Sequence, residues 1–267
     1  MISTEASSAL EGLGLHRGEP ASLEIVRAPG PVAFSRGEVV RPIRAFRLVA
    51  SPRATSLVSD AFAVSTVEHL FAALAGLAVR AGCRSVLGGG EELPLLDGTA
   101  MPYVRKLEQL GLAPSPPELR VAREGRVEVD GSVYELHPGG GVEVSVDVDL
   151  PPSCAREARW DGEPASFMAI AGARTFARAE DVEELSRLGV ARHVDPQSVL
   201  VVSDDAIQGV APIARDEPAR HKLLDLIGDV YFWGGPPRGS LRVTRPGHAR
   251  NHRAFEQALA QGILVRE

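Results

Sequence analysis

Residues 220–229 read RHKLLDLIGD, a stretch in which apolar residues recur at helical spacing. His221, Asp225 and Asp229 follow one another at intervals of four, and residues four apart are neighbours on the surface of a helix. The stretch therefore predicts an amphipathic helix that carries these three side chains on one stripe. An imidazole beside a carboxylate supplies two of the three protein ligands that a catalytic zinc uses, with the fourth position open for water.

A third ligand can be sought among the other histidines, of which His69 has the most suggestive setting. Glu68 precedes it at the start of an apolar run, residues 70–77, and a carboxylate beside a metal ligand can serve as a general base. A plainer interpretation is also open, because Ser65 or Thr66 followed by Glu68 is typical of a helix start with an acidic first turn. A lone His-x-x-x-Asp pair is likewise more often a structural feature than a metal site.

His248 follows a short strand-like run, residues 240–244, and a Pro-Gly turn signal. This order predicts a strand-to-helix junction, where a histidine is free to act as a proton donor. Asp229 extends the stripe of His221 and Asp225 by one turn, so it can belong to the same site. The alternative for Asp229 is a solvated helix carboxylate.

Six segments together resemble the family of UDP-3-O-acyl-N-acetylglucosamine deacetylases, the zinc enzymes that commit precursors to lipid A. In chain order these segments are GLGLHRG (12–18), STVEHLFAAL (65–74), LPLLDGTA (93–100), GARTF (172–176), RHKLLD (220–225) and GH (247–248). Each alone is weak evidence, but six in the family's order make a specific signal. The resemblance implies zinc-dependent hydrolysis of the acetamide of an acylated UDP-amino sugar, with release of acetate.

Carried over residue by residue, the resemblance implies that His69, His221 and Asp225 bind one Zn²⁺ per chain. It further implies that Glu68 is the general base and that His248 is the partner acid. All five residue types are present at the matching positions.

The same resemblance assigns supporting roles around these five. Thr175 would help to polarise the amide oxygen, and Asp229 would hold His248 and stabilise its charge. Lys222 and Phe176 would contact the substrate. Arg245 is also expected to bind substrate, because it lies near a catalytic histidine in sequence and an arginine can pair with phosphate. Arg238 and Arg250 are expected to be solvated surface residues.

The chain has 267 residues, of which 44% are hydrophobic, enough for one large or two small packed domains. Three prolines in APSPPE (113–118) read as an extended break, so we expect an N-terminal domain at 1–113, a linker at 114–118 and a C-terminal domain at 119–267. The first would carry Glu68 and His69, and the second His221, Asp225 and His248.

Strand and helix patterns occur in both predicted domains, which indicates a two-domain α+β sandwich. Strands are expected at 21–26, 126–130, 133–136 and 142–150, the last three antiparallel, and helices at 67–78, 103–110, 179–188, 218–232 and 251–261. The resemblance implies a duplicated fold with helices packed on sheets and zinc in the interdomain cleft.

The net charge of −6 argues against general nucleic-acid binding but permits an anionic nucleotide substrate. Cys83 and Cys154 lack Cys-x-x-Cys spacing, so neither a disulfide framework nor a thiolate zinc site is expected. No stretch reaches the roughly 18 apolar residues of a membrane helix, and no signal sequence is recognisable. We therefore expect a cytoplasmic protein without a transmembrane segment, and a monomer.

The chain departs from the family around the substrate rather than the metal. The family usually has a longer and more apolar insertion after GARTF, which builds a passage for the acyl chain, whereas residues 177–209 carry many charges here. Amphipathic placement predicts that Val182, Leu185, Leu188 and Val190 line an apolar interior. Two alternatives stay open: a divergent zinc deacetylase of another N-acylated amino sugar, and a non-catalytic homologue that binds zinc or a nucleotide sugar.

Overall fold

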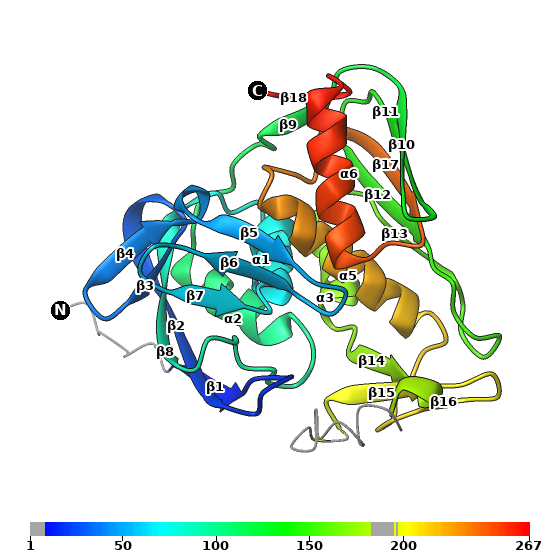
Figure 1. The fold of residues 1–267 in the computed structure, drawn as a ribbon, viewed down its shortest axis with the longest axis horizontal. Helices are drawn as coiled ribbons and strands as arrows, with labels where there is room; N and C mark the ends of the chain where they lie inside the picture. The colour runs from blue at the N-terminus through cyan, green and yellow to red at the C-terminus, as the bar shows by residue number, and fades with distance from the viewer. Residues whose placement is uncertain (1–8, 183–194, 196) are drawn as a thin grey trace.

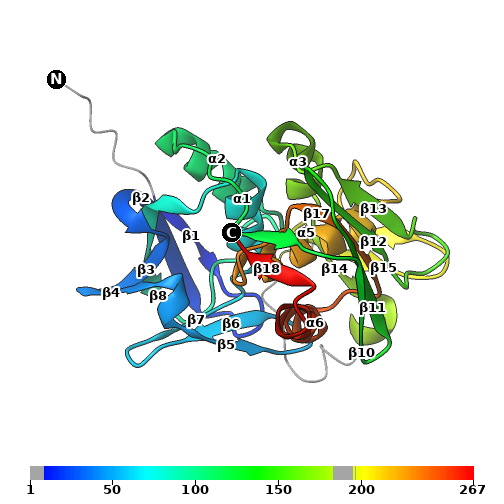
Figure 2. The ribbon, with the colours of Figure 1, turned by 90° about the horizontal axis from the view of Figure 1, so that it is seen from above.

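Two helices, α1 (Glu68–Gly76) and α5 (Glu217–Tyr231), pack against each other at the centre of the molecule, between two five-stranded sheets (Figures 1 and 2). The computed structural model describes residues 9–182, 195 and 197–267. Both helices are buried on nearly all sides. The result is the α+β architecture expected from the sequence.

The first half forms one sheet in the order β1-β2-β8-β3-β4 and a small sheet in the order β5-β6-β7. Residues 21–26 alternate as predicted, with Leu23 and Ile25 turned into the core. The elements are β1 (Leu10–Leu13), β2 (Pro20–Pro31), β3 (Ala33–Arg36), β4 (Val39–Pro42), η1 (Ile43–Ala45), β5 (Arg47–Ala50), β6 (Thr55–Val58), β7 (Ala63–Ser65), α1, β8 (Ala81–Gly89) and α2 (Met101–Leu110).

The second half forms a sheet in the order β10-β11-β17-β12-β13, a small sheet in the order β14-β15-β16 and the pair β18-β9. The elements are β9 (Leu119–Val121), β10 (Gly125–Val129), β11 (Ser132–His137), β12 (Val142–Asp147), β13 (Glu157–Trp160), α3 (Pro164–Ala171), β14 (Thr175–Arg178), β15 (Val199–Val202), β16 (Ile207–Gln208), α5, β17 (Gly239–Thr244), α6 (His248–Ala260) and β18 (Leu264–Arg266). Helix α6 runs beside α5 (Figure 1).

The three strands expected to be antiparallel in this half alternate in direction as predicted, but the third is not a neighbour of the second. β10 and β11 pair antiparallel as expected, but β17 lies between β11 and β12 and runs parallel to β12. Alternation of apolar and polar residues predicts a strand and its buried face, but it carries no information on which strand lies beside it. β12 also ends at Asp147, three residues earlier than predicted.

Helix α1 begins where the sequence predicted, but not through a side-chain cap. Its N-cap is Val67, which makes no side-chain cap hydrogen bond, and the Thr66 hydroxyl donates to the carbonyl oxygen of Ser65. The carboxylate of Glu68 accepts a hydrogen bond from the backbone N–H of Thr55 on β6. The capping interpretation of this segment is therefore wrong, and the Glu68 side chain is turned toward another element.

The segment after β14 is only partly described. Residues 179–182 are helical, at the start of the predicted helix 179–188, while residues 183–188 lie outside the described residues. Val182 is 37% exposed, so it does not line an apolar interior, and Leu185, Leu188 and Val190 fall outside the described part. Within the described ranges no helix has both the length and the apolar character needed to cross a membrane. The predicted division into domains at 114–118 stays a prediction.

Candidate active site

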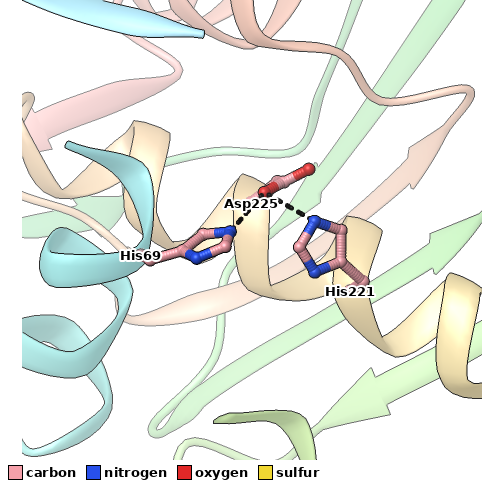
Figure 3. Close-up of side chains that lie close together, drawn as sticks. All are labelled: His69, His221 and Asp225. Carbon is pink, nitrogen blue, oxygen red and sulfur yellow. Dashed lines mark ion pairs between the residues drawn. The ribbon is translucent and has the colours of Figure 1, made fainter. Parts of the chain in front are cut away.

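Three side chains with metal-ligand chemistry point toward one another where α1 meets α5 (Figure 3). His69 projects from the first turn of α1, while His221 and Asp225 project from successive turns of α5. The Nε2 atoms of His69 and His221 lie 3.8 and 3.5 Å from Oδ1 of Asp225, and one ligand atom of each residue lies within 4.8 Å of the others. The structure thus brings together the three residues that the sequence predicted to share a site.

The protonation states of these side chains suit a divalent cation. Burial, with the neighbouring His221 ring, lowers the pKa of His69 to about 3, and burial also lowers the pKa of His221. Nδ1 of His221 lies 3.2 Å from the carbonyl oxygen of Ala173, to which it donates when Nε2 carries the free lone pair. Burial alone would raise the pKa of Asp225, but Lys222 and the histidines hold it well below its usual range. Two neutral imidazoles and a carboxylate therefore face one another.

Glu68 lies beside this group, and its carboxyl is buried. Burial raises the pKa of its carboxyl to about 7, with Asp229 and Asp225 adding to the effect and His248 opposing it. A group that changes protonation near the working pH is suited to accept a proton and release it again. The position predicted for a general base thus has the matching acid–base property.

His248 is the first residue of α6, at the strand-to-helix junction that the sequence predicted. Its Nδ1 lies 3.1 and 3.0 Å from the two oxygens of Asp229, and its Nε2 lies 3.9 Å from Oδ2 of Asp225. Burial disfavours a charged ring, but the Asp229 carboxylate and then Asp225 outweigh it and raise the pKa of His248 to about 9. The ring is therefore an imidazolium at neutral pH.

The alternative that Asp229 is a solvated helix carboxylate is wrong, because its side chain is fully buried. Burial works against its charge, but the interaction with His248 and further hydrogen bonds hold the pKa of Asp229 well below its usual range. Thr55, Asn251 and His248 all contact its oxygens.

A cavity of about 730 Å³ opens over the cluster and is lined by residues from both halves of the chain. All four side chains predicted to handle the substrate lie on its wall: Thr175, Phe176, Lys222 and Arg245. Nζ of Lys222 donates to Oδ2 of Asp225 at 2.8 Å and lies 5.6 Å from the centre of the Phe176 ring. Their contacts with substrate stay predictions.

Of the three arginines considered from the sequence, two line the cavity rather than the one expected. Arg245 is half exposed at the cavity, 3.7 Å from Asp149, and Arg250 lines the same cavity although it was expected to be a surface residue. Arg238 pairs with Glu267 on the surface, as expected.

Sequence reasoning missed several residues that support the cluster. Thr55, Asn251 and His252 surround Asp229, and His16 faces the cavity while its Nδ1 lies 2.8 Å from the buried Glu92. Only the GLGLHRG segment gave a signal for His16. The others come from β6 and the interior of α6, where no local pattern marks them.

Comparisons with known proteins point to one family. A family model described as UDP-3-O-acyl N-acetylglycosamine deacetylase matches residues 3–261. Proteins named UDP-3-O-acyl-N-acetylglucosamine deacetylase include one from Myxococcus xanthus (strain DK1622), 33% identical over 95% of this chain and 84% of its own length. Those from Anaeromyxobacter dehalogenans (strain 2CP-C) and Hahella chejuensis (strain KCTC 2396) are 34% and 33% identical, over 93% and 94% of this chain and 84% and 87% of their own lengths.

These matches place the chain among the deacetylases, which are hydrolases. It belongs to the UDP-3-O-acyl-N-acetylglucosamine deacetylase family. The resemblance inferred from six sequence segments is thereby confirmed.

Proposed function

We propose that this chain hydrolyses the acetamide of UDP-3-O-acyl-N-acetylglucosamine and releases acetate, as a step of lipid A biosynthesis. Family membership over residues 3–261 supports this activity. One observation carries the proposal. Glu68, a carboxyl that can take up a proton, and His248, a charged imidazolium, lie in one buried cluster with three side chains suited to a metal.

His69, His221 and Asp225 would hold one zinc ion. Ligand atoms bound at about 2.0–2.1 Å in a tetrahedral arrangement lie roughly 3.4 Å apart. The donor separations of 3.5 and 3.8 Å to Asp225 are close to that value. Zinc in such a site supplies Lewis-acid chemistry, which activates water and polarises a carbonyl group. The same ligands suit iron or cobalt, so metal analysis of the purified protein decides the metal.

The protein side chains supply the proton transfers. Glu68 takes a proton from the water that attacks the amide carbon, and the Thr175 hydroxyl donates to the carbonyl oxygen as negative charge develops there. His248 then gives its proton to the departing amine nitrogen as the carbon–nitrogen bond breaks, leaving acetate and a free amine. Asp229 keeps the ring of His248 charged and oriented until that transfer.

Lys222, Phe176 and Arg245 would bind the substrate along the cavity wall, with Arg245 toward the diphosphate. Its half-exposed guanidinium at the cavity supports that role. The cytoplasmic location and the monomeric state expected from the sequence belong to the same proposal. Cell fractionation and the molar mass in solution test them.

The deciding experiment measures deacetylation of UDP-3-O-acyl-N-acetylglucosamine by protein of known metal content. The Glu68→Ala variant and an acyl-free substrate are run alongside. Turnover that needs the metal, Glu68 and the acyl chain supports the proposal. Equal turnover of the acyl-free substrate would instead indicate a deacetylase of another N-acylated amino sugar. A metal-loaded protein without turnover on either substrate contradicts both activities.

A further inference from the structure

Thr55, the first residue of β6, contacts the proposed base, Glu68, and the carboxylate of Asp229, which holds the proposed acid, His248. Its backbone N–H donates to Oε2 of Glu68 at 3.2 Å, and its hydroxyl donates to Oδ1 of Asp229 at 2.6 Å. The residue is fully buried, so no solvent competes for either hydrogen bond. Thr55 thus links the proposed base on α1 with the carboxylate on α5 that holds His248.

Two neighbouring side chains, Trp233 and His252, fix the direction in which the Thr55 hydroxyl donates. The indole N–H of Trp233, which can only donate, lies 3.0 Å from Nδ1 of His252, so that nitrogen must accept and the ring proton sits on Nε2. Nε2 of His252 lies 2.8 Å from Oγ1 of Thr55 and donates to it. The single hydroxyl proton of Thr55 is then left for Asp229, which as a carboxylate accepts only.

The other oxygen of Asp229, Oδ2, also accepts a hydrogen bond from a donor of fixed orientation. The side-chain amide of Asn251 donates to Oδ2 of Asp229 at 2.8 Å. The amide oxygen of Asn251 accepts in turn from the hydroxyl of Tyr134 at 2.7 Å and the backbone N–H of Gly247 at 3.2 Å, which sets the amide orientation. With a donor on each oxygen, the carboxylate plane is fixed, and His248 meets both oxygens.

We propose that Thr55 is a positioning residue for deacetylation: its hydroxyl orients Asp229, and through Asp229 the ring of His248, for proton transfer to the departing amine. His252 and Trp233 serve this role by fixing the direction of the Thr55 hydroxyl. The inference rests on the proposed function of His248 as the acid. It assigns no chemical step to Thr55 itself.

The Thr55→Val variant tests the role, because valine has nearly the same shape but no hydroxyl. We expect kcat to fall by about 10- to 100-fold, the usual effect of losing a group that orients a catalytic or ligand side chain, while KM and metal content stay unchanged. Thr55→Ser keeps the hydroxyl and should restore most of the activity. Ser56→Ala, the next residue on β6, removes a hydroxyl that is hydrogen-bonded to Ser65 instead, and should leave kcat unchanged.

A double-mutant cycle separates orientation from a general loss of stability. If Thr55 acts through His248, Thr55→Val should cost almost nothing further once His248→Ala has removed the ring. Multiplying losses would overturn the inference, as would a Thr55→Val variant as active as the wild type. Should Thr55→Val fail to fold, the pair Thr55→Ala and Thr55→Ser differs only in the hydroxyl and decides the same question.

Failure of the proposed function and failure of the role of Thr55 give different results. A wild-type protein without turnover defeats the proposed function and the inference with it. An active wild type whose His248→Ala variant is equally active defeats the assignment of the acid and, with it, the inference. Full activity of Thr55→Val beside an impaired His248→Ala overturns the inference alone.

Discussion

Gly228 of α5 lies so close to Glu68 of α1 that a β-carbon at position 228 would stand 2.0 Å from the carbonyl oxygen of Glu68. No side chain fits at that distance, so the two helices cross at backbone contact. Glu68 adjoins His69, and Gly228 lies between Asp225 and Asp229 on the next helix. The crossing therefore sets the distance between the proposed metal ligand from the first half, His69, and those from the second, His221 and Asp225.

Replacing Gly228 by alanine should push the two helices apart. We expect the free energy of unfolding to fall by about 1–3 kcal/mol, as for other overpacked cores, and the metal affinity to fall with it. Chemical denaturation and metal titration measure the two effects. Gly172→Ala is the matched control, because its β-carbon would meet its nearest atom, the carbonyl oxygen of Met168, at an ordinary 3.6 Å. Equal behaviour of the two variants would contradict this explanation.

Glu68→Gln should remove the base and spare the metal. The amide keeps the size of the carboxylate but cannot take a proton, so kcat should fall by roughly a hundred- to ten-thousand-fold. Metal content per chain, measured by elemental analysis, should equal that of the wild type. Glu124→Gln, a change at a side chain 78% exposed, serves as the control. A Glu68→Gln variant with normal kcat would exclude Glu68 as the base.

The pH dependence of kcat/KM should be bell-shaped. Glu68 acts as a carboxylate, so activity rises with pH through its pKa of about 7, and His248 acts as an imidazolium, so activity falls as pH rises through about 9. A bound dication lowers the pKa of a neighbouring carboxyl, which moves the acidic limb below pH 7 in the metal-loaded enzyme. Residual activity of His248→Ala should lose the alkaline limb. An unchanged limb in that variant would assign it to another group.

Removing the metal should cost both activity and stability. A chelator should abolish turnover and lower Tm, because a ligand that binds only the folded protein stabilises it, and added zinc should restore both. In His69→Ala the zinc-dependent rise in Tm should be lost or much reduced. A full rise in that variant would place the metal elsewhere.

Arg245→Ala should raise KM for the UDP-sugar substrate and change kcat little, since an interaction equal in ground and transition states affects binding alone. Arg238→Ala is the control, because Arg238 pairs with Glu267 away from the cavity. Equal KM values in both variants would remove Arg245 from the substrate site. Steady-state kinetics with varied substrate distinguishes these outcomes.

The sequence predicted what depends on local pattern. Spacing of four placed His221, Asp225 and Asp229 on one face of α5. The turn signal before His248 indicated a strand-to-helix junction there, although the helix predicted at 251–261 begins earlier, at His248. Family segments linked these positions to His69, which no periodicity could do. The juxtaposition in the folded chain agrees with that link.

What escaped prediction depends on contacts between distant segments. Thr55 and Asp229 are 174 residues apart, and nothing near Thr55 in sequence marks it as a partner of a carboxylate. The insertion of β17 beside β12 likewise follows from how the whole sheet assembles. The raised pKa of Glu68 arises from burial, which the sequence around it does not reveal.

The division of the proposed metal ligands between α1 and α5 would also order events during biosynthesis. The N-terminal half emerges from the ribosome first and carries His69 and Glu68, but an isolated histidine holds a divalent cation only weakly. The remaining ligands arrive with α5, near the end of the chain. A nascent or truncated polypeptide would therefore not capture the proposed ion stably, so metal loading would follow completed folding.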